Sequence, residues 1–282
     1  MKLNFTKMQG CGNDYVYIST FDQKVEDMSA VAKKLSDRHF GIGGDGVIFV
    51  CPSDVADGRM RMFNEDGSEG KMCGNGVRCV AKYLYDHQLA CKKSLSVETL
   101  SGIKTIELTM DGKEVVGATV NMGQAKTAPA DIPVLLPGDE IIDRLINIGG
   151  SDYHITCIGM GNPHCVVFTD DVKNFPLSSV GPLFEHSELF PESVNTEFVR
   201  VIDETHLEMR GWERGSGETL ACGTGACASV AAAVKNGYCK KDVPVTVSLL
   251  GGDLRIIYSD HYVMMEGPAK TVFEGVCDLD KV

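Results

Sequence analysis

Two cysteines stand in nearly identical glycine-rich strings, one in each half of the chain. Cys73 begins the string Cys-Gly-Asn-Gly, and Cys222 begins Cys-Gly-Thr-Gly. A helical pattern follows each string, so each thiol is expected just before a helix start. Unpaired backbone N–H groups and the helix dipole favour the reactive thiolate there. Two such thiols, acting from opposite sides of one substrate, suit the removal and return of a proton at a carbon atom.

The elements around the two cysteines are predicted to follow the same order. Helices are predicted at residues 29–36, 77–85, 178–186 and 225–236. Short β-branched and aromatic runs predict strands at residues 3–8, 15–19, 47–50, 59–63, 94–98, 104–110 and 115–120, and again at 154–159, 165–169, 197–202, 207–212, 243–249, 254–258 and 262–266. This repeated order indicates an internal duplication into two α+β domains. The site is then expected in the cleft between them.

A stretch rich in proline and small residues, 124–138, separates the two halves of the sequence. Its composition predicts a linker or a long loop.

Composition excludes several classes of protein. The chain has 282 residues, of which 43% are hydrophobic and 23% charged, as in soluble globular proteins. The net charge of −12, without a basic patch, argues against nucleic-acid binding. The N-terminus lacks a signal peptide and no apolar run is long enough to span a membrane, so we expect a cytoplasmic protein.

Cysteine usage points to free thiols rather than to disulfides or metal. The count of 11 is odd, and neither a C-x-x-C pair nor an H-E-x-x-H motif occurs. We therefore expect reduced thiols in a reducing cytosol and no metal site. The cysteines outside the two glycine-rich strings are expected to pack as small hydrophobic residues.

Two motifs resemble nucleotide or phosphate sites and are rejected. Residues 41–46 fit G-x-G-x-x-G, but they precede a predicted strand, whereas a dinucleotide motif follows a strand and opens a helix. A tight turn is expected there instead. Only four residues separate Cys73 from Arg78, one fewer than in the phosphate-binding loop of cysteine phosphatases.

Four further strings place amide, charged or hydroxyl side chains on glycine-rich turns, where they suit a small, doubly charged ligand. They are Gly12-Asn13-Asp14, Met62-Phe63-Asn64 with Asp66-Gly67-Ser68, Gly161-Asn162-Pro163-His164, and Glu213 to Thr219. Together with Lys7 to Gly10, Gly41 to Gly43, Arg78-Cys79 and the two cysteine strings, they resemble the diaminopimelate epimerases over nearly the whole chain. The run from Glu213 to Ala226 is the most specific part of this resemblance.

The resemblance implies an enzyme that interconverts L,L- and meso-diaminopimelate without pyridoxal phosphate or metal. That step supplies lysine biosynthesis and, in many bacteria, the peptidoglycan cross-link. The implied fold is α+β, with two pseudo-symmetric domains, each a curled, mostly antiparallel sheet around a central helix, in a homodimer. We expect one domain to comprise residues 1–121 and 268–282 and to carry Cys73. The other is expected to comprise residues 122–267 and to carry Cys222.

The resemblance also implies a role for each matching position. Cys73 and Cys222 match the acid/base pair, and His164 and Glu213 match residues that tune those thiols. The backbones at Gly74-Asn75 and Gly223-Thr224 match the cradle of the reacting carboxylate. Side chains that match substrate-binding residues are Asn13, Asn64, Asn162, Asn195, Glu213 and Arg214. In one departure, a substrate-contacting glutamine of some members is replaced by Gly46 here.

The chemistry accounts for both the cysteines and the glycines. Epimerisation needs a base on one face of the α-carbon and an acid on the other, so one thiol must be deprotonated when its partner is not. Proton transfer by a placed side chain contributes only about 10²–10⁴-fold. The remaining acceleration is expected from N–H donors at two helix starts, which the glycines allow close to the substrate carboxylate. Arg214 could grip the distal carboxylate.

Three alternatives remain open on the sequence alone. A proline racemase of the same superfamily would share both thiols but lack the distal grip of Glu213 and Arg214. A cysteine hydrolase could use Cys73 and His164, but it leaves Cys222 without a role. A noncatalytic ligand-binding protein on the same fold would have little use for either thiol.

Overall fold

The computed structural model describes residues 1–281 and divides into two compact units. Unit 1 comprises Met1–Asn121 and Glu266–Val282, and unit 2 comprises Met122–Met265. The divisions therefore follow residues 121 and 265, whereas the sequence analysis placed them after residues 121 and 267. The chain returns from unit 2 to unit 1 along strand β17 (Val263–Pro268).

Unit 1 is built from nine further strands around one central helix. Its helices are α1 (Met28–Ser36) and α2 (Gly74–Asp86). Its strands are β1 (Lys2–Gly10), β2 (Asn13–Ser19), β3 (Gly46–Cys51), β4 (Gly58–Asn64), β5 (Glu69–Gly70), β6 (Ser94–Thr99), β7 (Gly102–Asp111), β8 (Glu114–Asn121) and β18 (Lys270–Asp278). Adjacent strands pair antiparallel, apart from the parallel pairs β2–β3 and β4–β6.

Unit 2 repeats this arrangement. Its helices are η1 (Pro129–Asp131), α3 (Leu177–Glu185) and α4 (Gly223–Lys235). Its strands are β9 (Arg144–Ile148), β10 (Ser151–Gly159), β11 (Pro163–Phe168), β12 (Asn195–Asp203), β13 (His206–Glu213), β14 (Gly217–Glu218), β15 (Val245–Leu249) and β16 (Gly252–Tyr258). The parallel pairs are again two, β11–β12 and β13–β15, and the others are antiparallel.

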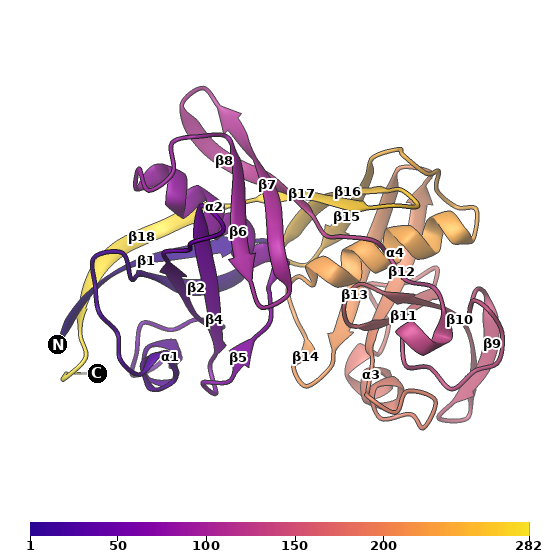
Figure 1. The fold of residues 1–282 in the computed structure, drawn as a ribbon. Helices are drawn as coiled ribbons and strands as arrows, with labels where there is room; N and C mark the ends of the chain where they lie inside the picture. The colour runs from indigo at the N-terminus through magenta and orange to yellow at the C-terminus, as the bar shows by residue number, and fades with distance from the viewer. Residues whose placement is uncertain (282) are drawn as a thin grey trace. The chain divides into compact units, whose positions relative to one another are not determined.

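The two units match element by element. The series β1, β2, α1, β3, β4, β5, α2, β6, β7 has the same order and strand pairing as β10, β11, α3, β12, β13, β14, α4, β15, β16. Figure 1 shows α2 among the strands of unit 1 and α4 among those of unit 2. The predicted α+β class, with a mostly antiparallel sheet around a central helix in each half, is confirmed.

The central helices are buried on nearly every side because the sheets curl around them. In α2 every residue from Gly74 to Leu84 is buried, and α4 is an almost unbroken run of buried small residues. A helix that is apolar all round belongs in a core, which the alanine-rich α4 satisfies. In α2, the fully buried Arg78 bonds the carbonyl oxygens of Gly74 and Pro268, so its charged group is satisfied within unit 1.

Several predicted elements differ from those observed. Of the two predicted alternatives, the stretch 124–138 is a long loop rather than a linker, because it belongs to unit 2 and Ile132 and Val134 lie in the hydrophobic core of that unit. Strands β5, β9, β14 and β18 were not predicted. Both central helices begin earlier than their apolar periodicity indicated, with α2 starting at Gly74 and α4 at Gly223.

Candidate active site

Cys73 is the N-cap residue of α2, as its sequence context predicts. Its extended backbone turns the sulfur back over the first turn, where Sγ accepts a hydrogen bond from the N–H of Gly76 at 3.3 Å. The thiol in turn donates to Oδ1 of Asn13 at 3.1 Å. Cys73 is partly exposed.

The amide of Asn13 is oriented by the carboxylate of Asp45. Its Nδ2 donates to Oδ2 of Asp45 at 2.6 Å, which leaves its oxygen facing Cys73 and Asn75. Asp45 is itself held by Nη2 of Arg38 at 2.8 Å. Because a carboxylate only accepts hydrogen bonds, this arrangement fixes which end of the Asn13 amide meets the thiol.

Tyr15 lies beside Cys73 and was not predicted as a site residue. Its side chain is 5% exposed and hydrogen-bonds to Cys73. Burial, followed by the nearby charges of Cys73 and Asp45, raises the pKa of Tyr15 well above its ordinary value. The phenol therefore stays protonated at neutral pH.

Cys222 is the N-cap residue of α4 in the same conformation. Its Sγ accepts from the N–H of Gly225 at 3.4 Å and lies 3.5 Å from the hydroxyl oxygen of Thr224. The residue is 6% exposed. The helix start thus offers the same N–H donor to each of the two cysteines.

The electrostatic setting of Cys222 opposes its ionisation. Burial is the largest cause that raises the pKa of this thiol well above its ordinary value, and the charges of Glu213 and Glu197 add to it. The hydrogen bonds from Thr224 and Gly225 act in the opposite direction but are smaller. The expectation that a helix start would favour a thiolate is therefore outweighed at Cys222.

Glu213 ends β13 beside this thiol. Its carboxylate accepts a hydrogen bond from the hydroxyl of Thr219 and is hydrogen-bonded to Cys222. Burial raises the pKa of Glu213 above its ordinary value, with a smaller upward contribution from the charge of Glu197. Glu213 is therefore well placed to exchange a proton with Cys222.

His164 lies wholly buried between two polar partners in unit 2. Its Nδ1 is 2.7 Å from Oε1 of Glu197, and its Nε2 is 2.9 Å from Oδ1 of Asn162. The Nδ2 of Asn162 donates to the hydroxyl of Thr224 at 3.4 Å. Side chains from β11, from the turn before it and from α4 are therefore connected around Cys222.

Asn195 and Arg214 meet at the adjacent strand ends. Asn195 donates from Nδ2 to the carbonyl of Pro163 at 2.8 Å and accepts at Oδ1 from the backbone N–H of Arg214 at 3.0 Å. The guanidinium of Arg214 is exposed and donates to the carbonyl of Glu192. The carboxylate of Glu218 is bound by Arg210 instead, at 2.7 Å.

Comparison with known proteins agrees with this geometry. The family model "Diaminopimelate epimerase" matches residues 5–128 and 156–272. A diaminopimelate epimerase of Methanococcus maripaludis is 50% identical over 279 residues, covering 98% of this chain and 100% of that protein. One from Desulfovibrio desulfuricans is 51% identical over 281 residues and covers 97% of each chain.

The chain belongs to the diaminopimelate epimerase family. The crystal structure of a probable proline racemase from Agrobacterium radiobacter, with bound carbonate, has a TM-score of 0.71 to this chain at 11% sequence identity, and the alignment covers 98% of this chain and 92% of that one. At this identity the similarity shows a shared fold. The probable proline racemase therefore shares the fold of this chain. The family model and the two relatives confirm the predicted family.

The glutamine contact of some diaminopimelate epimerases has no room at Gly46. A Cβ atom at this position would run into the carbonyl oxygen of Phe63 and lie 2.9 Å from the ring of Tyr15. Gly46 pairs with Tyr15 across β2 and β3, as Asn195 pairs with His164 across β11 and β12. The equivalent place in unit 2 therefore carries an amide side chain that unit 1 lacks.

Other features of the chain lie apart from Cys73 and Cys222. The glycine-rich residues 41–46 form a turn whose N–H groups bond back to the end of α1 before β3 begins, as the sequence predicted. Within residues 1–281, no group of three or more His, Cys, Asp or Glu side chains is arranged to hold a metal ion. No helix in this range is long and apolar enough to cross a membrane.

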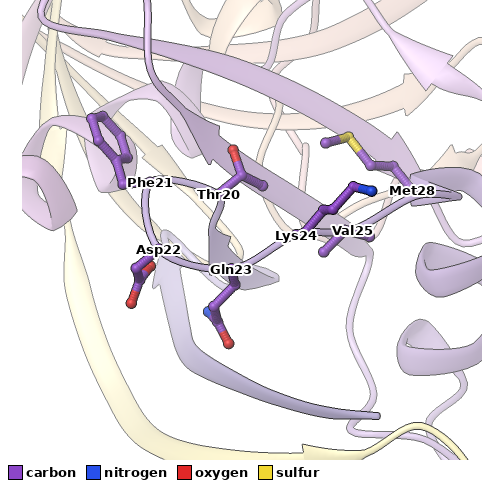
Figure 2. A pocket seen from close by; sticks show the side chains of 7 residues that line it. All are labelled: Thr20, Phe21, Asp22, Gln23, Lys24, Val25 and Met28. Atoms are coloured by element: carbon purple, nitrogen blue, oxygen red, sulfur yellow. The ribbon is translucent and has the colours of Figure 1, made fainter.

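An open hollow on unit 1 is separate from both cysteines. It is lined by Thr20 to Val25 and by Met28, between β2 and the start of α1 (Figure 2). None of the predicted site residues lines it, and its side chains form no cluster of groups suited to acid/base chemistry. The hollow is therefore not part of the candidate site.

Proposed function

We propose that this protein converts L,L-diaminopimelate into meso-diaminopimelate, without a cofactor, by two-base chemistry at Cys73 and Cys222. The observation that carries the proposal is the matched placement of two thiols as N-caps of equivalent helices, in a chain of the diaminopimelate epimerase family. The name of that family identifies the substrate, and the step would supply lysine biosynthesis and, in many bacteria, peptidoglycan precursors.

In this mechanism the substrate α-carbon lies between the two sulfurs. The thiolate of one cysteine takes the α-proton, and the thiol of the other gives a proton to the opposite face. The carbon is inverted without oxidation or reduction, and the two cysteines exchange protonation states. Because the raised pKa of Cys222 favours its thiol, we assign Cys222 as the acid, and Cys73 acts as the base after the thiol that donates to Asn13 has lost its proton to solvent.

The backbone at each helix start would stabilise the charge that develops on the reacting carboxylate. The N–H groups of Gly74-Asn75 and Gly223-Thr224 are the proposed donors, since the first N–H groups of a helix have no partner within it. Asn13 and Asn162, held beside these helix starts, would orient the amino acid end of the substrate. Preorganised donors of this kind lower the barrier to forming a carbanion.

The distal end of the substrate would be held by Arg214. Its guanidinium is exposed and bonded to a single backbone carbonyl, so it can turn to bind a carboxylate with two hydrogen bonds. Asn64 at the end of β4 and Asn195 at the start of β12 would add hydrogen bonds, and Glu213 could face an ammonium group. This distal grip distinguishes diaminopimelate from proline. We also propose that the enzyme works as a homodimer in the cytoplasm.

An isotope experiment tests the proposal against its main rival. The purified protein is incubated in deuterated water with L,L-diaminopimelate or with L-proline, and deuterium at the α-carbon is followed by mass spectrometry. We expect deuterium in diaminopimelate and none in proline. Deuterium in proline alone would establish a proline racemase instead. Hydrolysis that survives Cys222→Ala would favour the cysteine hydrolase, and binding of diaminopimelate without exchange would favour the ligand-binding protein.

A further inference from the structure

Glu197 is a buried carboxyl group beneath the helix start that carries Cys222. It comes from the buried first half of strand β12 and is 0% exposed. A Cβ atom placed on Gly225 would lie 2.6 Å from its Oε1, so the carboxyl group fills the space directly under the first turn of α4. Burying a carboxyl group in such a place costs folding free energy unless a hydrogen-bond partner offsets the loss of water.

The equivalent position in unit 1 is apolar. Ile48 pairs with Tyr17 across β2 and β3, and Glu197 pairs with Val166 at the matching place across β11 and β12. A Cβ atom on Gly76 would lie 2.6 Å from Cδ1 of Ile48. An aliphatic side chain is therefore enough to pack under a helix start in this fold, and packing alone does not account for Glu197.

The hydrogen bonds of Glu197 define the state of His164. The Nδ2 of Asn162 donates to Thr224, so its Oδ1 faces Nε2 of His164 and can only accept. Nε2 therefore carries a proton that it donates to Asn162. At Nδ1, on the other side of the ring, a second proton must lie between Nδ1 and Oε1 of Glu197, which are 2.7 Å apart. The other oxygen, Oε2, has no hydrogen-bond partner among residues 1–281. All of the polar contact that Glu197 makes there is thus directed at His164.

We propose that Glu197 is a positioning residue for Cys222 that acts through His164. By binding Nδ1 it holds the imidazole with Nε2–H directed at Asn162. The amide of Asn162 is thereby turned toward the hydroxyl of Thr224, which lies 3.5 Å from the sulfur of Cys222. The kinetic part of this inference rests on the proposed epimerisation, whereas the part about the ring of His164 does not.

The test compares two substitutions of nearly equal size. Glu197→Gln keeps a group that can hydrogen-bond to Nδ1, whereas Glu197→Met fills the same space without one. We expect Glu197→Met to lower kcat by about 10- to 100-fold with little change in KM, because small misplacements of reacting groups have effects of this size. Glu197→Gln is expected to keep at least about a third of the wild-type kcat, since it retains the bond.

The matched control is Ile48→Met, which makes a similar change of shape under the helix start of unit 1. Ile48 has no polar group to lose, so we expect kcat to stay within about twofold of wild type. Thermal unfolding of each variant separates misfolding from misplacement. Glu197→Met leaves Nδ1 of the buried His164 without its partner, so this variant is expected to unfold at a lower temperature than wild type, and kcat is compared below that temperature.

A spectroscopic measurement decides the matter if Glu197→Met does not fold. The ring N–H signals of ¹⁵N-labelled histidines are recorded, with His164 assigned by the loss of its signal in His164→Gln. We expect the protonated Nε2 of His164 in wild type and in Glu197→Gln and, where Glu197→Met folds, its loss or displacement there. Wild-type kcat in a folded Glu197→Met, equal losses in both variants, or loss of the signal in Glu197→Gln would overturn the proposal. An inactive wild type would instead overturn the proposed function.

Discussion

Ile48 in β3 and Glu197 in β12 occupy equivalent places under the first turns of α2 and α4. Similar differences occur at neighbouring positions, where Tyr15 corresponds to His164 and Asn64 to Glu213. The two units therefore have the same backbone arrangement but differ in the side chains around their cysteines. Cys73 donates to the neutral amide of Asn13, which Asp45 orients, whereas burial and the charges of Glu213 and Glu197 oppose ionisation of Cys222.

Removal of either cysteine is the first prediction. We expect Cys73→Ala and Cys222→Ala each to lower kcat by about 10³-fold or more, because each face of the carbon loses its only proton carrier. Epimerisation is followed by separating the two stereoisomers by chromatography. Cys91→Ala, which removes an exposed thiol, is the control and should keep wild-type activity. Retention of activity in one of the two alanine variants would contradict a two-base mechanism.

The raised pKa of Cys222 gives a prediction about pH. Alkylation by iodoacetamide requires the thiolate, so Cys222 should react slowly at pH 7 and speed up only above about pH 8.5, the ordinary thiol value. Glu213→Gln removes one of the charges that oppose ionisation, so the midpoint of the alkylation profile should move to lower pH. The extent of alkylation is measured by peptide mass spectrometry across a pH series.

The control for this experiment is Glu218→Gln. Glu218 lies in the same loop, but its carboxylate is paired with Arg210 and it is not among the groups that shift the pKa of Cys222. Its substitution should leave the profile of Cys222 in place. An unmoved midpoint in Glu213→Gln would show that Glu213 does not act on this thiol.

Alanine substitution of Gly76 and Gly225 should reveal how differently Ile48 and Glu197 accommodate a new side chain. A Cβ at Gly76 or Gly225 meets its neighbour at 2.6 Å, so both substitutions should destabilise the protein, by about 1–3 kcal/mol. Ile48 can shift its terminal methyl group, but Glu197 is bonded to His164. Gly225→Ala should therefore lose more activity than Gly76→Ala. Denaturant unfolding and kcat are measured for both.

Gly211→Ala is the matched control for these substitutions. The side chain of Met209 would be 3.6 Å from the new Cβ, an ordinary van der Waals contact. We expect little change in the free energy of unfolding or in kcat. Equal losses at residues 76, 211 and 225 would mean that close contact under the helix starts is not the cause.

The sequence predicted the two helix starts because cysteine and glycine are needed there for local reasons. It did not predict Glu197, since one acidic residue within an apolar strand reads as a residue on a solvated face. Its burial results from α4 crossing over β12, a contact that no local pattern contains. Asp45 and Tyr15 were missed for the same reason. Asp45 is linked to Cys73 through the side chain of Asn13, and Tyr15 is placed by the pairing of β2 with β3.

The strands that the sequence missed also have physical explanations. β5 and β14 are two residues each, too short to show alternation, and they form because the chain turns back on β4 and β13. β18 is largely exposed, so it lacks the apolar face that marks a strand in sequence. Its pairing with β1 at the opposite end of the chain is what makes it a strand.

Substitution at the distal grip should act on binding. Arg214→Lys keeps the charge but loses the planar, two-pronged donor, so we expect KM for diaminopimelate to rise about tenfold with a smaller change in kcat. The control is Arg200→Lys, on an exposed part of β12 where the guanidinium lies 3.5 Å from Glu208. Steady-state kinetics with both stereoisomers provide the measurement. A lower kcat with unchanged KM would place Arg214 at the reacting end of the substrate instead.

Oxidation tests whether the two thiols face one carbon atom. Sulfurs on opposite sides of a single α-carbon must come close, so mild oxidation of the ligand-free protein should link Cys73 to Cys222 and abolish activity. Dithiothreitol should restore it, and bound diaminopimelate should protect against it. The bond is identified by mass spectrometry of peptides from unreduced protein. Cys91→Ser, which lacks an exposed thiol, should be inactivated like wild type. Oxidised protein that stays active, with both thiols still titratable, would contradict the facing arrangement.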